Sequence, residues 1–255
     1  MGYVMLSRIQ TLSQLYIIDS VPENKLRPWP SALEELEKMN SKALNKDDIH
    51  VGEFKLTSLN SRSFRKHVLD VKGDYQLLKS HVICLQETWL DMFEESDERY
   101  KLNSIKSHFN SQGRGIGIVT FYVDSFVPVN DISNPQFQMT KIESPNLSVI
   151  NVYRSNNADN SFLKALQTLI SFERTLIICG DFNFCMKEQE FHPIHEYLTG
   201  LNFVQLVDEA THIEGRTLDH VYLFLKKTND PSNFECKVEG CYYSDHDKVI
   251  VSLNY

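Results

Sequence analysis

The stretch TLIICGDFN, residues 175–183, decides the fold class of this chain. Its continuous apolar run is typical of a strand that is buried on both faces. Gly180 allows unusual backbone angles directly after the run, and Asp181 and Asn183 then lie on one sharp turn. A plain Gly-Asp turn is common in α/β proteins. A DFN triplet after four apolar residues instead favours polar side chains held for chemistry at the end of a rigid strand.

Similar runs on both sides of this stretch predict a layered α/β domain. Strands are predicted in EFKLTSL (53–59), HVICLQ (81–86), GIGIVTFY (115–122), NLSVINVY (146–153), TLDHVYLFL (217–225) and KVIVSLNY (248–255). Helix-like apolar spacing occurs over 64–78 and 162–170. Several neighbouring strands lack a helix between them, so two packed sheets with outer helices fit better than one parallel sheet.

The N-terminal part of the chain differs from the rest. Residues 5–19 and 31–44 carry two helical patterns, separated by a proline-containing break at 21–30. Alternating apolar strands begin only at Val51. We therefore divide the chain into an N-terminal helical segment, 1–50, and an α/β domain, 51–255.

Composition limits the function classes. The chain has 255 residues and a formal net charge of −8, so it is not a general nucleic-acid binder, and DNA binding would need a local basic patch and a bound metal. The odd count of five cysteines, without a CxxC pair, argues against a zinc knuckle or a disulfide scaffold. No membrane-length apolar stretch and no secretory pattern occur, so we expect an intracellular protein that is neither secreted nor membrane-bound.

Chemically useful side chains share one placement, because each lies at the end of a predicted strand. They are Asn60, Glu87, Tyr153, Asp181, Asn183, Asp219, Asp245 and His246. Strand ends that face one way gather distant residues into a single cleft.

Six stretches resemble the endonuclease/exonuclease/phosphatase superfamily, the DNase I-like fold. They are LNSRS (59–63), ICLQETW (83–89), VYRSN (152–156), ICGDFN (178–183), RTLDHVYL (216–223) and YSDHDKVI (243–250), in the family's order. The resemblance implies a four-layer α/β/β/α sandwich with the site at one edge of the two sheets.

The resemblance also assigns a metal and a nucleophile. Phosphodiester cleavage needs an activated water and neutralised phosphate charge. Glu87 is the principal expected ligand of Mg²⁺, or of Mn²⁺ in its place, with Asn60 and Asp245 assisting. Asn60 taken alone is equally well interpreted as a turn residue, and it could also contact the phosphate. Asp181 would hold or deprotonate the attacking water, and Asn183 would orient it.

The remaining assignments concern the imidazole and the substrate. His246 would act as a general base or as a cationic donor to phosphate, with Asp219 fixing its tautomer. Tyr153 resembles the family's phosphate-contacting tyrosine, although a half-buried strand aromatic is the plain alternative. Asn156 and Thr211 are assigned to substrate binding, Thr211 at the DNA backbone.

Two features point to an origin in mobile elements. Arg62 stands where relatives that repair abasic sites carry a second acidic residue, which weakens a repair role. Residues 3–19 resemble the last motif of RecD/Pif-type helicases, yet no GxxxxGK[ST] phosphate loop is present, so the chain alone cannot be an ATPase. A helicase followed by such a nuclease resembles the end of a Helitron-type transposon protein. LINE-type transposon endonucleases are similar as well.

We therefore expect a nuclear DNA endonuclease that nicks its substrate and belongs to a longer, helicase-containing parent protein. A phosphatase acting on small phosphorylated molecules uses the same site chemistry and stays an alternative. An inactive interaction module is a third possibility, against which the intact set of reactive side chains argues.

Overall fold

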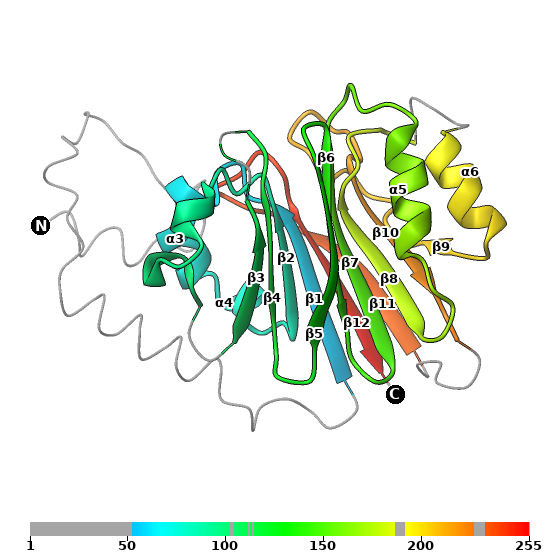
Figure 1. The fold of residues 1–255 in the computed structure, drawn as a ribbon, viewed down its shortest axis with the longest axis horizontal. Coiled ribbons are helices and arrows are strands. Elements are labelled where there is room, and N and C mark those ends of the chain that lie inside the picture. Colours follow the sequence, from blue (N-terminus) through cyan, green and yellow to red (C-terminus); the bar gives the residue numbers. More distant parts are fainter. Residues whose placement is uncertain are drawn as a thin grey trace, which may run out of the picture. The chain divides into compact units, whose positions relative to one another are not determined.

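The fold is known from a computed structural model that describes residues 53–254, apart from 103, 104, 112, 114, 187–191 and 227–232. The predicted helical segment 1–50 and its boundary lie outside the described residues. Two six-stranded sheets pack face to face, with helices on both outer faces (Figure 1). This arrangement confirms the predicted four-layer α/β/β/α sandwich.

The two sheets take their strands from different parts of the chain. Sheet A has the order β11-β12-β1-β2-β4-β3, formed by Asn233–Glu239, Lys248–Asn254, Glu53–Asn60, Val82–Gln86, Ile118–Tyr122 and Lys106–Asn110. Sheet B has the order β5-β6-β7-β8-β10-β9, formed by Val127–Asn134, Phe137–Glu143, Leu147–Arg154, Thr175–Asp181, Asp219–Phe224 and Val204–Gln205. The pairs β1–β2 and β7–β8 are parallel, and the other neighbours are antiparallel.

The helices divide between the outer faces. Helices α3 (Phe64–Gly73) and α4 (Tyr75–Leu78) cover sheet A, and α5 (Ser161–Leu169) and α6 (Pro193–Gly200) cover sheet B (Figure 1). The single helix expected over 64–78 is two helices, because Asp74 leaves helical geometry and caps α4 by accepting a hydrogen bond from the Leu77 backbone N–H. Two 3₁₀ turns, η4 (Met92–Glu94) and η5 (Glu98–Tyr100), follow β2. Within the described residues, no helix is long and apolar enough to span a membrane.

Three apolar layers hold the sandwich together. One lies between the sheets and includes Val82, Val149 and Val251, all fully buried. Each of the others lies between a sheet and its helices, around Phe64 on sheet A and around Phe162 on sheet B. Burial of this apolar area is the main stabilising contribution to the fold.

Strand direction brings the polar strand ends to one edge. The parallel strands β1 and β2 end at Asn60 and Gln86, and β7 and β8 end beside each other in the other sheet. The antiparallel strand β10 starts where β8 ends, so Asp219 lies directly opposite Asp181. Residues distant in sequence therefore meet at one edge of both sheets.

Candidate functional site

The amide of Asn60 joins carboxylates from the two sheets. Its Nδ2 donates to Oε1 of Glu87 at 3.0 Å and to Oδ2 of Asp181 at 2.8 Å. Asn60 and Asp181 are almost completely buried, whereas Glu87 is partly exposed. Because one nitrogen contacts both acids, the structure brings together the residues that the sequence placed in a single site.

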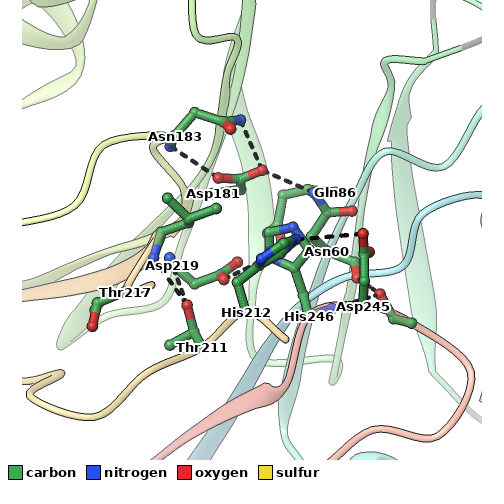
Figure 2. A network of polar contacts seen from close by, with 12 residues as sticks. Asn60, Gln86, Asp181, Asn183, Thr211, His212, Thr217, Asp219, Asp245 and His246 are labelled. Atoms are coloured by element: carbon green, nitrogen blue, oxygen red, sulfur yellow. Dashed lines mark hydrogen bonds and ion pairs between the residues drawn. The ribbon is translucent and has the colours of Figure 1, made fainter. Parts of the chain in front are cut away.

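The turn after β8 holds Asp181 rigidly (Figure 2). Its Oδ1 accepts from the backbone N–H of Asn183 at 2.9 Å, and its Oδ2 accepts from the Asn183 side-chain amide at 2.9 Å. The same amide donates to the backbone oxygen of Arg154 at 2.8 Å. Asn183 adopts the left-handed region, with φ of 51°, which asparagine tolerates better than most residues. The predicted sharp turn is therefore present.

Gly180 is required by the strand before this turn. Its φ is 139°, and a Cβ at this position would lie 1.9 Å from the backbone oxygen of Val152. No side chain fits there, because β7 and β8 approach too closely.

A second pair also crosses between the sheets. Nδ1 of His246, which precedes β12 in sheet A, lies 2.7 Å from Oδ2 of Asp219 in sheet B, and both side chains are buried (Figure 2). Asp219 thus orients the imidazole through Nδ1, and Nε2 takes no part in this hydrogen bond. The other oxygen of Asp219, Oδ1, is buried without a hydrogen-bond partner among the described residues.

Thr211 fixes the backbone that carries Asp219. Its Oγ1 accepts hydrogen bonds from the backbone N–H groups of Leu218 and Asp219, each at 3.0 Å. The residue is fully buried. In this structure its hydroxyl is therefore engaged inside the protein and holds the start of β10, and a contact of Thr211 with the DNA backbone stays a prediction.

The buried charges shift one another's pKa values. Burial and the neighbouring Asp219 carboxylate raise the pKa of Asp181 to about 8, while His246 and the Asn60 amide act in the opposite direction. Burial disfavours the imidazolium of His246, but Asp219, aided by Asp181 and Glu87, outweighs burial and raises the pKa of His246 to about 9. A raised carboxyl pKa beside a raised imidazole pKa suits a base and a cationic donor working together.

Asp245 faces a different set of partners. It forms an ion pair with Arg62, and its Oδ2 lies 3.4 Å from Nε2 of His212. The pKa of His212 is lowered by its burial and by the nearby His246. The guanidinium of Arg62 thus neutralises the Asp245 carboxylate. Arg62 stands at the position where the family resemblance places a second acidic residue in enzymes that repair abasic sites.

The two remaining predicted residues differ in placement. Tyr153 is buried, its hydroxyl donates to the backbone oxygen of Gly115 at 3.3 Å, and burial together with the charges of Glu87 and Asp181 raises its pKa. It therefore lies at the site. Asn156 is exposed on the turn after β7, and no hydrogen bond joins its side chain to the other described residues. Its role in substrate binding stays a prediction.

Residues 57–246 match the endonuclease/exonuclease/phosphatase family. The chain belongs to this family. The family's name covers endonucleases, exonucleases and phosphatases, which are all hydrolases of phosphate esters. No curated protein sequence matches the chain.

Solved structures share the fold of this family member at low sequence identity. An AP endonuclease from Archaeoglobus fulgidus matches with a TM-score of 0.59 and 16% identity, over 79% of this chain and 100% of that one. The 3′ phosphatase NExo from Neisseria, bound to product DNA hairpin, matches at 0.56 and 15%, over 79% and 100%. The endonuclease domain of TRAS1, a telomere-specific non-LTR retrotransposon, matches at 0.56 and 14%, over 79% and 98%. These likenesses establish the fold.

The divalent metal ion on which members of this family typically depend fits the donor atoms of the site. Glu87, Asp181 and Asp219 lie around one region, and the pKa of Asp181 is raised partly by their mutual repulsion. A bound cation relieves such repulsion, and carboxylate oxygens are the ligands that Mg²⁺ prefers. The partly exposed Glu87 is the acid most open to an ion from solvent.

In this structure Asn60 is engaged by protein groups on both sides of its amide. Its Oδ1 accepts a hydrogen bond from the backbone N–H of Arg62 at 3.0 Å. That N–H fixes the orientation of the amide, so the NH₂ group faces Glu87 and Asp181, and an NH₂ group repels cations. Asn60 thus aligns two acids in this structure, and its role as a metal ligand or at the phosphate stays a prediction.

Two polar residues that sequence reasoning missed brace the site from within the sandwich. Nε2 of Gln86, in β2, donates to Oδ1 of Asn151, in β7, at 2.7 Å, and Asn151 in turn donates to Oγ1 of Thr120 at 3.0 Å. All three are fully buried. The signal was present in the sequence, because Asn151 interrupts the apolar run of NLSVINVY. A buried amide there needs a partner, and the partner lies in the opposite sheet.

Proposed function

We propose that residues 51–255 form a Mg²⁺-dependent DNA endonuclease that nicks its substrate and derives from a mobile element. One observation carries the proposal: two hydrogen-bonded pairs, Asn60 with Asp181 and Asp219 with His246, cross between the sheets and converge on one edge. This set supplies a carboxylate to activate water and an imidazole to contact the phosphate.

The shifted pKa values assign different roles to Asp181 and His246. Asp181, with a pKa near 8, is mostly protonated at neutral pH while no cation is bound, and a bound cation would favour the carboxylate form that takes the proton of the attacking water. His246, with a pKa near 9, is protonated at neutral pH and donates from Nε2 to a phosphate oxygen. The water oxygen then bonds to phosphorus as the bond to the leaving oxygen breaks, and the leaving oxygen takes a proton from solvent water. Of the two roles that the sequence left open for His246, the raised pKa favours the cationic donor.

The other residues position these two. Asn183 and Asn60 fix the Asp181 carboxylate from three sides, and Tyr153 lies against the same acids. Glu87 would hold the Mg²⁺ ion, with Asp245 assisting, and Mn²⁺ takes the same oxygen ligands. When bound, the ion supplies charge neutralisation at the phosphate.

Three observations support DNA as the substrate. One structural neighbour is a DNA-bound enzyme of Neisseria and another belongs to a retrotransposon. Arg62 supplies a cation at the rim of the site, with its side chain 58% exposed. The helicase-like pattern in residues 3–19 supports a longer parent protein in which a helicase acts in cis in the nucleus.

Plasmid nicking tests the proposal. The chain should convert supercoiled plasmid to the open circle with Mg²⁺ and stop on addition of a chelator. His246→Gln should lower the rate by about two to four orders of magnitude, the usual contribution of such a group. His108→Gln is the matched control, because His108 also pairs with a carboxylate, that of Asp131, but lies on edge strand β3. Intact plasmid together with hydrolysis of a soluble phosphomonoester would favour a phosphatase, and no reaction with either substrate would favour an interaction module.

A further inference from the structure

A second set of metal-ligand atoms lies beside the proposed catalytic pair. One ligand atom from each of His212, Asp245 and His246 lies within 4.8 Å of the others. Two backbone segments carry them: the N–H of Ile213 donates to the oxygen of Asp245 at 2.9 Å, and the N–H of Asp247 donates to the oxygen of Thr211 at 2.8 Å. The three side chains are therefore held together by paired backbone and do not depend on a mobile loop.

The donor set differs in kind from the one around Glu87. Two imidazole nitrogens and one carboxylate oxygen are ligands that Zn²⁺ binds well, whereas Mg²⁺ prefers oxygen alone. Zn²⁺ bonds of about 2.0–2.1 Å in a tetrahedron place ligand atoms about 3.4 Å apart. Nε2 of His212 and Oδ2 of Asp245 already lie 3.4 Å apart.

His246 is already prepared as a metal ligand. Its Nδ1 is bonded to Asp219, which leaves Nε2 as the nitrogen for an ion, and its ring lies 4.8 Å from that of His212, centroid to centroid. A carboxylate behind a histidine is the usual support of a metal-bound imidazole, since it fixes the ring and raises its basicity. Oδ1 of Asp245 is also buried without a hydrogen-bond partner among the described residues.

We propose that His212, Asp245 and His246 bind a transition-metal ion of the Zn²⁺ class and that this ion inhibits the nuclease. The inhibition rests on the proposed function, but the binding does not. An ion on Nε2 of His246 takes the nitrogen that would otherwise donate to the phosphate, and it withdraws Asp245 from any role at the Mg²⁺ site.

Arg62 is the competitor of the ion. Its guanidinium pairs with Asp245, and because the side chain is 58% exposed it can move into water when a metal arrives. Arg62→Gln removes a positive charge from the site and should tighten Zn²⁺ binding.

Calorimetric titration of the full chain with Zn²⁺, without DNA, tests the binding. Absorption of bound Co²⁺ should show the bands of tetrahedral coordination. His212→Phe keeps a ring against His246 but has no ligand nitrogen, and Asp245→Asn removes the charged oxygen. Each should weaken Zn²⁺ binding by at least about tenfold, because loss of a residue that only supports a metal ligand already weakens metal binding by about 10- to 100-fold. Glu87→Gln, which removes the oxygen site, is the matched control and should leave Zn²⁺ affinity unchanged.

Inhibition is measured separately, as the Zn²⁺ concentration that halves Mg²⁺-supported nicking by each protein relative to its own rate without Zn²⁺. That concentration should rise by the same factor in His212→Phe. Wild-type Zn²⁺ affinity in both His212→Phe and Asp245→Asn, or loss of affinity in Glu87→Gln alone, would overturn the site. Zn²⁺ binding without inhibition would overturn the regulatory part only, and a chain that binds Zn²⁺ but never nicks DNA would instead refute the proposed function.

Discussion

Asp219→Asn is the substitution that tests the electrostatics of the site most directly. Oδ2 of Asp219 lies 2.7 Å from Nδ1 of His246, and both groups are buried, so solvent screens the pair only weakly. The pKa of His246 is raised from 6.5 to about 9, which corresponds to about 3 kcal/mol at about 1.4 kcal/mol per pKa unit. Asparagine keeps the shape of Asp219 and removes its charge.

The sign of the pH dependence follows from the raised pKa. A histidine whose pKa is higher in the folded protein contributes stability that is fully present below its unfolded pKa, about 6.5, and is lost as the pH rises through about 9. The difference in unfolding free energy between wild type and Asp219→Asn should therefore be largest at pH 6. It should shrink by about 3 kcal/mol by pH 9.5.

Urea unfolding at a series of pH values, in EDTA and followed by circular dichroism, measures this difference. Nicking by Asp219→Asn should also fall by about two to four orders of magnitude, because the imidazolium is no longer held. Asp131→Asn removes the comparable partner of His108, but those side chains are 28% and 38% exposed, so only a small change is expected. A difference that stays constant from pH 6 to 9.5, or nicking at the wild-type rate, would refute the coupling.

Three further substitutions test the scaffold and the metal. Gly180→Ala should destabilise the protein by at least about 3 kcal/mol, because its Cβ would meet the backbone oxygen of Val152 at 1.9 Å, and the loss should be seen as less soluble folded protein. Gly240→Ala is the control and should be neutral, because its nearest contact would be at 3.9 Å. Equal stability of the two variants would contradict the close approach of β7 and β8. Thr211→Val should lower the free energy of unfolding, measured in urea, by about 2–5 kcal/mol, because two buried N–H groups lose their acceptor. Thr211→Ser keeps the hydroxyl and should keep most of the wild-type stability. An unchanged urea midpoint in Thr211→Val would show that the hydroxyl does not support β10. Glu87→Gln should raise the Mg²⁺ concentration needed for half-maximal nicking by at least about tenfold, and an unchanged requirement would move the metal away from Glu87.

The sequence predicted the strands that build the centre of the fold. All seven predicted strands are present as β1, β2, β4, β7, β8, β10 and β12. Each carries a continuous or alternating apolar run because it is buried in the sandwich. The missed strands β3, β5, β9 and β11 lie at sheet edges or, in the case of β9, contain only two residues. An edge strand such as β5 is mostly exposed, so polar residues hide its pattern.

Strand β6 was missed for a different reason. It is buried, but Gln138, Thr140 and Lys141 interrupt its apolar pattern. Gln138 and Thr140 find partners outside the strand, in Gly117 and Asp131, and Lys141 pairs with Glu143 within it. Among the site residues, strand-end placement and family resemblance identified the acids and the imidazole. They could not reveal that the Asn60 amide turns its nitrogen toward the acids, since that depends on the Arg62 backbone. The burial of Thr211 likewise follows from contacts of its loop with β10.

The strand order has a consequence for the moment at which cleavage begins. Strand β12 is the last described strand in the sequence, yet it inserts between β1 and β11, and His246 lies two residues before its first paired residue, Lys248. During synthesis, the ribosome thus adds all the acids of the site before it adds His246. On the proposed mechanism, turnover requires that β12 has docked, so a premature stop codon before residue 246 should abolish nicking and leave β1 without its antiparallel neighbour β12.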